Sequence, residues 1–384
     1  MKSNTKMLSS LFAICLCAML YGNLCAAILL PKTDYTLTVI AGENTYVYAY
    51  PEIDLYKGGL YLKDLDGAID RIYRDTFVSP TDATVSFMPR SANKFTITSE
   101  VCGKKIDKSH LYRTISTALQ SKTEEITVPL KSISPTITKE FLCAHTNCRA
   151  EFKTFYGSSS SGRKHNIQLC AEMLNGKVVE SGESFSFNAA VGERTYERGF
   201  TNAKVISEGR FIDGVGGGVC QVSSTIYNCV LLAGLDIEER HPHSLSVSYV
   251  EPSFDAMVSY GACDLKFKNT TDGPIFIECF ADGSNITVRL YGKAMPHTVK
   301  RISKTLKTEC PGMDVILDAT GELCGELDEV VIFPSKHSIV SEGFLEFYEG
   351  EKLVKTKPLG RSSYGGVKGV LAKKAPKTQI NEEL

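Results

Sequence analysis

A cysteine near the middle of the chain stands where it could act as a nucleophile. Cys220 follows a glycine-rich run at residues 214–218, and apolar residues then recur at helical spacing until Gly234. We therefore expect Cys220 on the first turn of a helix, where unpaired N–H groups and the helix dipole favour an anion. A thiol there ionises more readily, and the thiolate is the reactive form. The alternative is a small core residue, because free cysteine is among the most buried residue types.

Two histidines follow this cysteine within about twenty-five residues. His241 and His243 flank a proline, and they point to the same side if the segment is a regular strand. A cysteine with a downstream imidazole is the minimal thiol-nucleophile pair. Cys143 and Cys148 with His145 between them suggest zinc, but the spacing fits no standard finger, so we expect no metal.

The bulk composition excludes some functions and leaves others open. A length of 384 residues suggests two or three domains, and 43% hydrophobic and 23% charged residues are ordinary for a globular protein. A net charge of −1 gives no sign of a nucleic-acid surface.

Two pairs of cysteines are near enough in sequence to form disulfides: Cys143 with Cys148, and Cys310 with Cys324. Connectivity does not follow from spacing.

The first thirty residues have the pattern of an export segment. Lys2 and Lys6 precede an apolar run at residues 7–20, and small residues at 25–27 offer a cleavage site. If uncut, residues 7–30 are long enough to span a bilayer once. We expect either a cleaved signal peptide or a membrane anchor, and both place the remainder outside the cytoplasm.

The sequence predicts helices and strands along the whole chain, and some of them would position the cysteine. Hairpins are predicted within 34–50 and 83–98, helices over 62–77 and from Asp107, and an edge strand at 125–130. A helix at 166–174 and a strand at 183–188 precede the glycine run. Short strands are predicted at 256–260, 263–268, 274–280 and 284–291, with a tight turn at Asp282-Gly283. This sheet would support the cysteine helix from one face. Beyond residue 298 we expect strands at 330–333 and 344–348, a turn at 362–366 and a polar tail.

Seven short motifs occur in order between residues 166 and 291. They are Phe185-x-Phe187-Asn188, Gly216-Gly217-Gly218-x-Cys220-Gln221-x-Ser223-Ser224-Thr225-x-Tyr227, Arg240-x-x-His243-Ser244, Tyr249-Val250, Asp255-Ala256, Asp264-Leu265 and Phe267-x-Asn269. Together they resemble the VanW family, although Ser253-Phe254 stands where many members have a glycine. The segment at 34–135, with Phe95-x-Ile97-x-x-Glu100-x-x-Gly103-x-x-Ile106-Asp107, is similar to the peptidoglycan-binding domain that often precedes VanW domains.

The resemblance implies an α+β, multi-domain organisation. It places a signal peptide or anchor at 1–30 and a small peptidoglycan-binding-like α+β domain at 34–135. A VanW domain, with a mixed or antiparallel sheet packed by helices, follows at 150–296. A β-rich extension, similar to a G5 module, and a tail complete the chain at 297–384. The protein would then be exported to the cell wall of a Gram-positive-type bacterium, in a family named for a link to vancomycin resistance.

The resemblance also implies an activity and roles for residues. Some members are understood to be L,D-transpeptidases, which form 3-3 peptidoglycan cross-links through a thioester on the motif cysteine, here Cys220. The partners would be peptidoglycan stem peptides, with no cofactor. His243 would be the general base and acid, with His241 as second candidate. Asp255 or Asp264 would orient the histidine, or would be a solvated or turn carboxylate.

Substrate contacts are expected around the cysteine. N–H groups around Gly218 to Gln221 would hold an oxyanion, and such donors typically contribute about 3 kcal/mol each. Gly217 and Gly218 are themselves candidates for substrate contact. Further candidates for substrate contact, each with a structural alternative in helix-start bonding, surface charge or core packing, are Gln221, Ser223, Ser224, Arg240 and Tyr249. Two rival functions remain: a non-catalytic peptidoglycan-binding or envelope scaffold protein, and a cysteine hydrolase of stem peptides.

Overall fold

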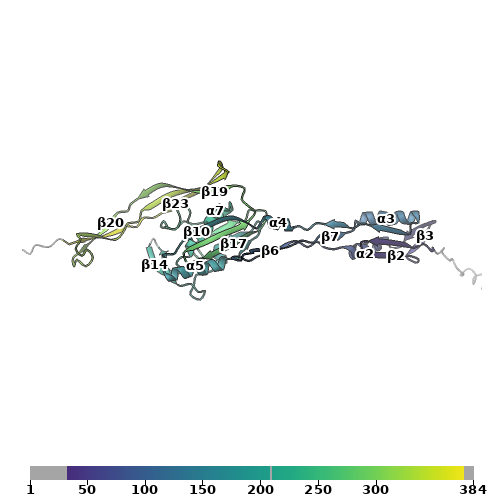
Figure 1. The fold of residues 1–384 in the computed structure, drawn as a ribbon, viewed down its shortest axis with the longest axis horizontal. Coiled ribbons are helices and arrows are strands. Elements are labelled where there is room, and N and C mark those ends of the chain that lie inside the picture. The colour runs from purple at the N-terminus through teal and green to yellow at the C-terminus, as the bar shows by residue number, and fades with distance from the viewer. Residues whose placement is uncertain (1–32, 208–209, 376–384) are drawn as a thin grey trace, which may run out of the picture. The chain divides into compact units, whose positions relative to one another are not determined.

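The chain folds as two units, each with its own core. The computed structural model describes residues 33–207 and 210–375, so the expected export segment lies outside the described residues. One unit comprises Met1–Ala83 and Ser99–Thr138, and the other comprises Thr84–Thr98 and Lys139–Leu384 (Figure 1). More residues lie in strands than in helices, and the strands form several small sheets. This is the multi-domain α+β fold that the sequence predicts. No helix of the described ranges is long and apolar enough to cross a membrane.

The first unit is a small sheet packed by two helices. β1 (Leu37–Ala41) pairs antiparallel with β2 (Asn44–Tyr48) and parallel with β8 (Glu125–Val128), which lies at the edge as predicted. The predicted helices form as α2 (Leu65–Thr76) and α3 (Lys108–Ser121), and Asp107 caps α3 through the N–H of His110. Two short pairs complete the unit: β3 (Ile53–Tyr56) with β4 (Gly59–Leu62), and β7 (Gly103–Lys105) with β9 (Lys131–Ile133).

The second predicted hairpin forms but packs with the second unit. β5 (Thr84–Phe87) pairs with β6 (Phe95–Thr98), and Phe87 stacks on Phe95 with ring centroids 5.0 Å apart. Both rings also pack against Phe276 and Tyr291 of the second unit. The hairpin is therefore anchored by aromatic contacts that its position in the sequence does not reveal.

An antiparallel sheet carries the two main helices of the second unit. Its strands run in the order β10 (Asn147–Phe155), β18 (Asn285–Gly292), β17 (Ile275–Ala281) and β11 (Val178–Val179). α7 (Val219–Leu232) packs on β10 and β18, and α5 (Ser161–Leu174) packs on β17. The expected support of the cysteine helix by a sheet is confirmed, as is the turn at Asp282-Gly283 between β17 and β18.

Smaller elements surround this sheet. They are α4 (Lys139–Ala144), α6 (Phe187–Val191), the sheet β12 (Ser184–Ser186), β16 (Lys266–Lys268) and β15 (Asp236–Glu239), and the hairpin β13 (Asn202–Ser207) and β14 (Arg210–Val215). The prediction of a strand at 256–260 is wrong, since only single bridges at Met257 and Ser259 form there. The strand predicted at 183–188 stops at Ser186, whose hydroxyl accepts from the Ala189 N–H and so starts α6.

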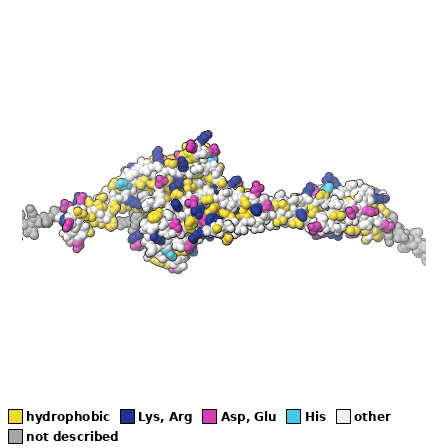
Figure 2. Space-filling model, viewed as in Figure 1, with side chains coloured by type: hydrophobic (Ala, Val, Ile, Leu, Met, Phe, Trp, Pro, Cys, Tyr) yellow, Lys and Arg dark blue, Asp and Glu magenta, His cyan; other side chains and the backbone are white. Residues whose placement is uncertain are grey.

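The C-terminal part consists of two three-stranded sheets. One contains β19 (Thr298–Glu309), β22 (Ser338–Glu349) and β23 (Lys352–Tyr364), and the other β20 (Met313–Asp318), β24 (Gly369–Lys374) and β21 (Glu329–Phe333). The expected turn at 362–366 is wrong in its first half, because β23 continues to Tyr364, a residue that is only 3% exposed. Figure 2 shows acidic and basic side chains mixed over the visible face, in keeping with the small net charge.

Candidate active site

Glycines place the start of α7 against its neighbours. Gly218 is the N-cap with φ of 109°, a conformation that residues with a side chain rarely adopt. A Cβ at Gly217 would lie 2.7 Å from the Cβ of Ala203 and 2.7 Å from the Lys204 carbonyl oxygen. The glycine run therefore permits both a left-handed turn and close contact with β13, and Cys220 follows as the second residue of the helix.

α7 is buried along nearly its whole length, and its polar side chains are satisfied internally. Gln221 donates to Thr154 Oγ1 (3.0 Å) and to the Phe155 carbonyl (2.9 Å). Asn228 donates to the Ser224 and Phe254 carbonyls at 2.6 and 2.7 Å. Cys220, in contrast, is only half-buried. The helix is thus a fixed internal element that presents its thiol at one end.

Cys220, His243 and Asp255 form a connected triad. Nδ1 of His243 donates to Asp255 Oδ2 at 2.6 Å, and the His243 backbone N–H donates to the same oxygen at 2.7 Å. Nε2 of His243 is not engaged by Asp255, and the imidazole lies close enough to Cys220 to act on its thiol, which donates to the Val258 carbonyl at 3.4 Å. His243 and Asp255 are 5% and 1% exposed. The thiol lies beside the imidazole, and the imidazole is held by a buried carboxylate. This arrangement is the one used in covalent cysteine catalysis.

The electrostatics of this triad favour an ion pair. Burial opposes ionisation of the thiol, but the hydrogen bond and charge of His243 outweigh it, so the pKa of Cys220 is lowered. Burial also opposes protonation of His243, yet its hydrogen bonds with Asp255 and Cys220 raise its pKa to about 9. The lowered pKa of the thiol and the raised pKa of the imidazole both favour the thiolate–imidazolium pair over the neutral pair.

Two arginines lie close enough to Cys220 for their charges to act on it. Arg163, in the first turn of α5, donates from Nη2 to Gln221 Oε1 at 2.8 Å. Arg194 donates from Nη1 to Asn188 Oδ1 at 2.7 Å, and its guanidinium lies over the ring of Phe187. Nη2 of Arg194 is buried and has no hydrogen-bond partner within residues 33–207 and 210–375. A buried donor without a partner is costly, which makes this nitrogen a candidate for a ligand contact.

Several residues predicted for the site have other partners. His241 bonds Glu239 at 3.1 Å and its side chain is 40% exposed. Asp264 accepts from Ser186 Oγ and from the Asn188 N–H, so it holds the start of α6. Arg240 donates from Nη2 to Asp255 Oδ1 at 2.7 Å, which places its charge behind the triad.

The remaining candidates for substrate contact lie around Cys220, and their polar groups are hydrogen-bonded within the protein. The hydroxyls of Ser223 and Ser224 donate to the Cys220 carbonyl at 3.1 and 2.7 Å, as expected of helix-start bonding. Tyr249 donates to the same carbonyl at 3.3 Å. The side chain of Gln221 is fully engaged. These residues brace the nucleophile, and the structure does not present their side chains as free groups.

Comparison with known proteins identifies the family of the chain. Residues 162–291 match the family described as "VanW like protein". The chain is 33% identical over 269 residues to the uncharacterized protein YoaR of Bacillus subtilis (strain 168), an alignment that covers 67% of this chain and 84% of that protein. The chain belongs to the VanW family. Residues 60–127 match a second family, described as "Putative peptidoglycan binding domain".

Two more distant similarities concern parts of the chain. The vancomycin B-type resistance protein VanW of Enterococcus faecalis (strain ATCC 700802 / V583) is 28% identical over 167 residues, which cover 42% of this chain and 59% of that protein. A solved structure titled "Crystal structure of HP0197-G5" matches 20% of this chain and 93% of its own, at 14% identity and a TM-score of 0.13. The family matches support a peptidoglycan-related function and association with the cell wall.

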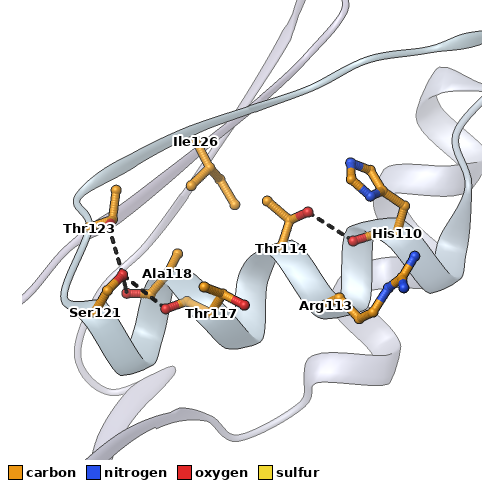
Figure 3. A pocket seen from close by; sticks show the side chains of 8 residues that line it. All are labelled: His110, Arg113, Thr114, Thr117, Ala118, Ser121, Thr123 and Ile126. Atoms are coloured by element: carbon orange, nitrogen blue, oxygen red, sulfur yellow. Dashed lines mark hydrogen bonds between the residues drawn. The ribbon is translucent and has the colours of Figure 1, made fainter.

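A shallow pocket lies on the peptidoglycan-binding-like unit of this VanW protein. Its volume is about 280 Å³, and it follows α3 on one side and includes Ile126 of β8 (Figure 3). Thr114, Thr117 and Ser121 line it, the hydroxyls of Thr114 and Ser121 donate to the α3 carbonyls of His110 and Thr117, and Figure 3 shows His110 and Arg113 at one end.

Three residues of the VanW site were missed by sequence reasoning. Arg163 and Arg194 lie outside the short motifs, and nothing in their local sequence marks them. Tyr364 donates to Asp255 but lies 109 residues further along the chain, in a segment interpreted as a turn.

All ten cysteines of the described residues are free thiols, so the pairings considered for Cys143 with Cys148 and Cys310 with Cys324 do not form.

Proposed function

We propose that this protein is a cysteine-dependent acyltransferase of the L,D-transpeptidase type, which acts on peptidoglycan stem peptides. The observation that carries the proposal is the triad of Cys220, His243 and Asp255, with a lowered thiol pKa at the start of a helix. The match of residues 60–127 to a peptidoglycan-binding domain supports the class of substrate.

In the acylation step, the Cys220 thiolate attacks the carbonyl carbon of the third residue of a donor tetrapeptide. The tetrahedral intermediate collapses, and the C–N bond to the terminal D-alanine breaks. Nε2 of the His243 imidazolium gives its proton to the departing amine, so D-alanine leaves with a neutral amino group. The products are a thioester on Cys220 and a neutral His243.

In the transfer step, an acceptor amine attacks the thioester carbonyl. His243 now accepts the proton of that amine at Nε2, the C–S bond breaks and the thiolate returns. Asp255 holds the imidazole in the tautomer that this exchange needs, because its oxygen accepts from Nδ1. The carbonyl carbon of the donor's third residue is thereby joined by an amide to the acceptor stem, in place of the amide to D-alanine that was cut.

The oxyanion of both intermediates needs hydrogen-bond donors at the start of α7. The N–H groups of Val219 and Gln221 already donate to the Gly216 and Gly218 carbonyls, at 3.2 and 2.9 Å. We therefore assign the backbone N–H of Cys220 as the oxyanion donor, aided by the positive end of the helix dipole.

Arg194 takes the substrate role that the sequence first suggested for Arg240. A donor tetrapeptide ends in a free carboxylate one residue beyond the scissile carbonyl. The partner-free Nη2 of Arg194 is a guanidinium donor in the surroundings of Cys220, and guanidinium binds carboxylates strongly. Its contact with the terminal carboxylate would direct cleavage to the last residue of the stem.

Incubation with a tetrapeptide stem followed by mass spectrometry of the products tests the reaction. Cross-linked dimers that disappear in Cys220→Ala support the transpeptidase. Trimmed monomers, without dimers, would instead show a hydrolase in which water takes the thioester. Full activity in Cys220→Ala would rule out both enzymes and leave a wall-binding or scaffold protein, a role that the peptidoglycan-binding match also fits.

A further inference from the structure

The C-terminal extension contacts the loop that carries the histidine and aspartate. The family match ends at residue 291, so β22 and β23 lie outside it. Gly365 donates its N–H to the Ser244 carbonyl at 2.7 Å, next to His243. Lys336 donates to the Ser246 carbonyl, and Ser303 Oγ donates to the Pro252 carbonyl at 2.7 Å. Residues 244–252 are thus fixed at several points by strands that follow the family domain.

The strongest of these contacts reaches the triad itself. Tyr364, the last residue of β23, donates its hydroxyl to Asp255 Oδ1 at 2.5 Å. The same hydroxyl accepts the Ser253 N–H at 2.7 Å. Tyr364 and Asp255 are 3% and 1% exposed, so neither group has water as a ready substitute.

The two carboxylate oxygens of Asp255 have different hydrogen-bond partners. Oδ2 accepts both bonds from His243, whereas Oδ1 accepts from Arg240 and Tyr364. Arg240 is itself held by Ser362 of β23, whose hydroxyl accepts from Nη1 at 2.8 Å. Both donors to Oδ1 therefore depend on β23, and they set the plane of the carboxylate that orients the imidazole.

The backbone before Asp255 depends on the same strands. Ser253 has φ of 74°, in the left-handed region that favours glycine, and it is 2% exposed. Its hydroxyl hydrogen-bonds Ser341 of β22 at 2.7 Å. Such a conformation persists only where surrounding contacts impose it, and here the contacts come from Ser341 and Tyr364.

We propose that the C-terminal extension completes the catalytic site, with Tyr364 as the positioning residue that fixes Asp255 and through it His243. The inference rests on the proposed role of the triad. The extension is then a part of the enzyme, in addition to any role as a spacer or binding module. Because burial and the charge of Asp255 raise the pKa of Tyr364 to about 12, its hydroxyl stays protonated and donates throughout the working range of pH.

Tyr364→Phe in the full chain tests this role, with Tyr348→Phe as the matched control. Tyr348 lies on β22, and its hydroxyl donates to Glu346 rather than to the catalytic loop. The readout is the rate of Cys220 alkylation by iodoacetamide between pH 5 and 10, followed by peptide mapping. The groups that act on this thiol are His243, Arg163, Arg194, Cys170 and Tyr249, and the substitution leaves each in place.

We expect the profile of Tyr364→Phe to move to higher pH, with alkylation at pH 7 slower by roughly tenfold. Tyr348→Phe should match the wild type. A folded Tyr364→Phe protein with the wild-type profile would overturn the proposal. If the variant does not fold, the change is made in a Ser253→Gly background, since glycine adopts the required φ without strain. The shift is then measured against Ser253→Gly alone.

The same experiment separates this inference from the proposed reaction. Alkylation reports the state of the thiol and needs no stem peptide. A shifted profile in a protein that never transfers a stem peptide would support the positioning role and contradict the transpeptidase. Transfer by the wild type with an unshifted Tyr364→Phe profile would do the opposite.

Discussion

At the scale of single residues, the properties of the site come from the buried pair of His243 and Asp255 beside the half-buried thiol of Cys220. Asp255 accepts from Nδ1 of His243, and the imidazole in turn lowers the pKa of the Cys220 thiol. The three cysteines in the core, Cys170, Cys229 and Cys279, have a raised pKa because burial opposes their ionisation. The difference between these thiols and Cys220 lies in the imidazole and not in the amino acid.

Reactivity of the thiol should depend on His243 and not on His241. His243→Asn removes the imidazolium that stabilises the thiolate, so we expect alkylation of Cys220 at pH 7 to slow by at least about tenfold. His241→Asn is the control, because His241 bonds Glu239 and should leave the rate unchanged. Peptide mapping is needed, since exposed Cys310 also has a lowered pKa, caused by the hydroxyl of Ser335. Equal rates in the two variants would contradict the triad.

The rate of stem-peptide transfer should have a maximum in pH. It rises as Cys220 loses its proton, which occurs below the usual pH for a thiol because its pKa is lowered. It falls as the pH passes about 9, where His243 loses the proton that it must give to the leaving amine. Steady-state kcat/KM against pH measures both limbs. A rate that keeps rising past pH 10 would exclude His243 as the general acid.

Selection of a terminal carboxylate should depend on Arg194. For the wild type, a donor peptide with an amidated end should have a KM roughly tenfold to hundredfold higher, the loss of one charge-assisted bond. In Arg194→Gln, the acid and the amide should behave alike. Arg163→Gln is the matched control, because its Nη2 bonds Gln221 and its loss should preserve the discrimination. Preserved discrimination in Arg194→Gln would remove this residue from substrate binding.

At the scale of elements, α7 is a buried polar helix whose start is fixed by glycines. Gly218→Ala would strain φ of 109° and bring a Cβ to 2.9 Å from Ile167 Cγ1. We expect a loss of about 1–3 kcal/mol in the free energy of unfolding, measured by urea denaturation. Gly261→Ala isolates the steric part, because Gly261 also has positive φ but open space at its Cβ. Equal losses would show that backbone strain alone sets the cost.

The elements near the cysteine could be predicted from the sequence because their signals are local. The glycine run, the apolar spacing after Cys220 and the Asp282-Gly283 turn each mark their own element. β10 was missed, although it pairs with β18 in the central sheet, because its alternation is interrupted by a bulge between Cys148 and Ala150. Tyr364 was missed because its partner lies 109 residues away. Long-range pairing leaves little mark on the local pattern.

At the scale of the whole molecule, binding and chemistry are assigned to different units. The peptidoglycan-binding-like match lies in the first unit, apart from its hairpin β5–β6, and the triad lies in the second. The chain crosses between the units at residues 83–84, 98–99 and 138–139, so a single cut cannot separate them. Substitutions, rather than truncations, are therefore the appropriate way to separate the two roles.

Binding to cell walls should survive loss of the nucleophile. Cys220→Ala changes one half-buried side chain, which belongs to the second unit. We expect it to sediment with purified sacculi as the wild type does, while conversion of muropeptides is lost. Loss of both properties together, in a folded variant, would place the wall contact at the triad and not in the first unit.

The central claim is that Cys220 forms a thioester with a peptidoglycan stem, and intact-mass spectrometry tests it most directly. The full-length chain is incubated with a tetrapeptide stem at neutral pH and quenched in acid, its mass is measured, and the adduct is located by peptide mapping. We predict a mass increase equal to the stem without its terminal D-alanine, on Cys220, that is absent in Cys220→Ala. A folded protein whose Cys220 gains no such mass, and resists alkylation at neutral pH, would contradict the account.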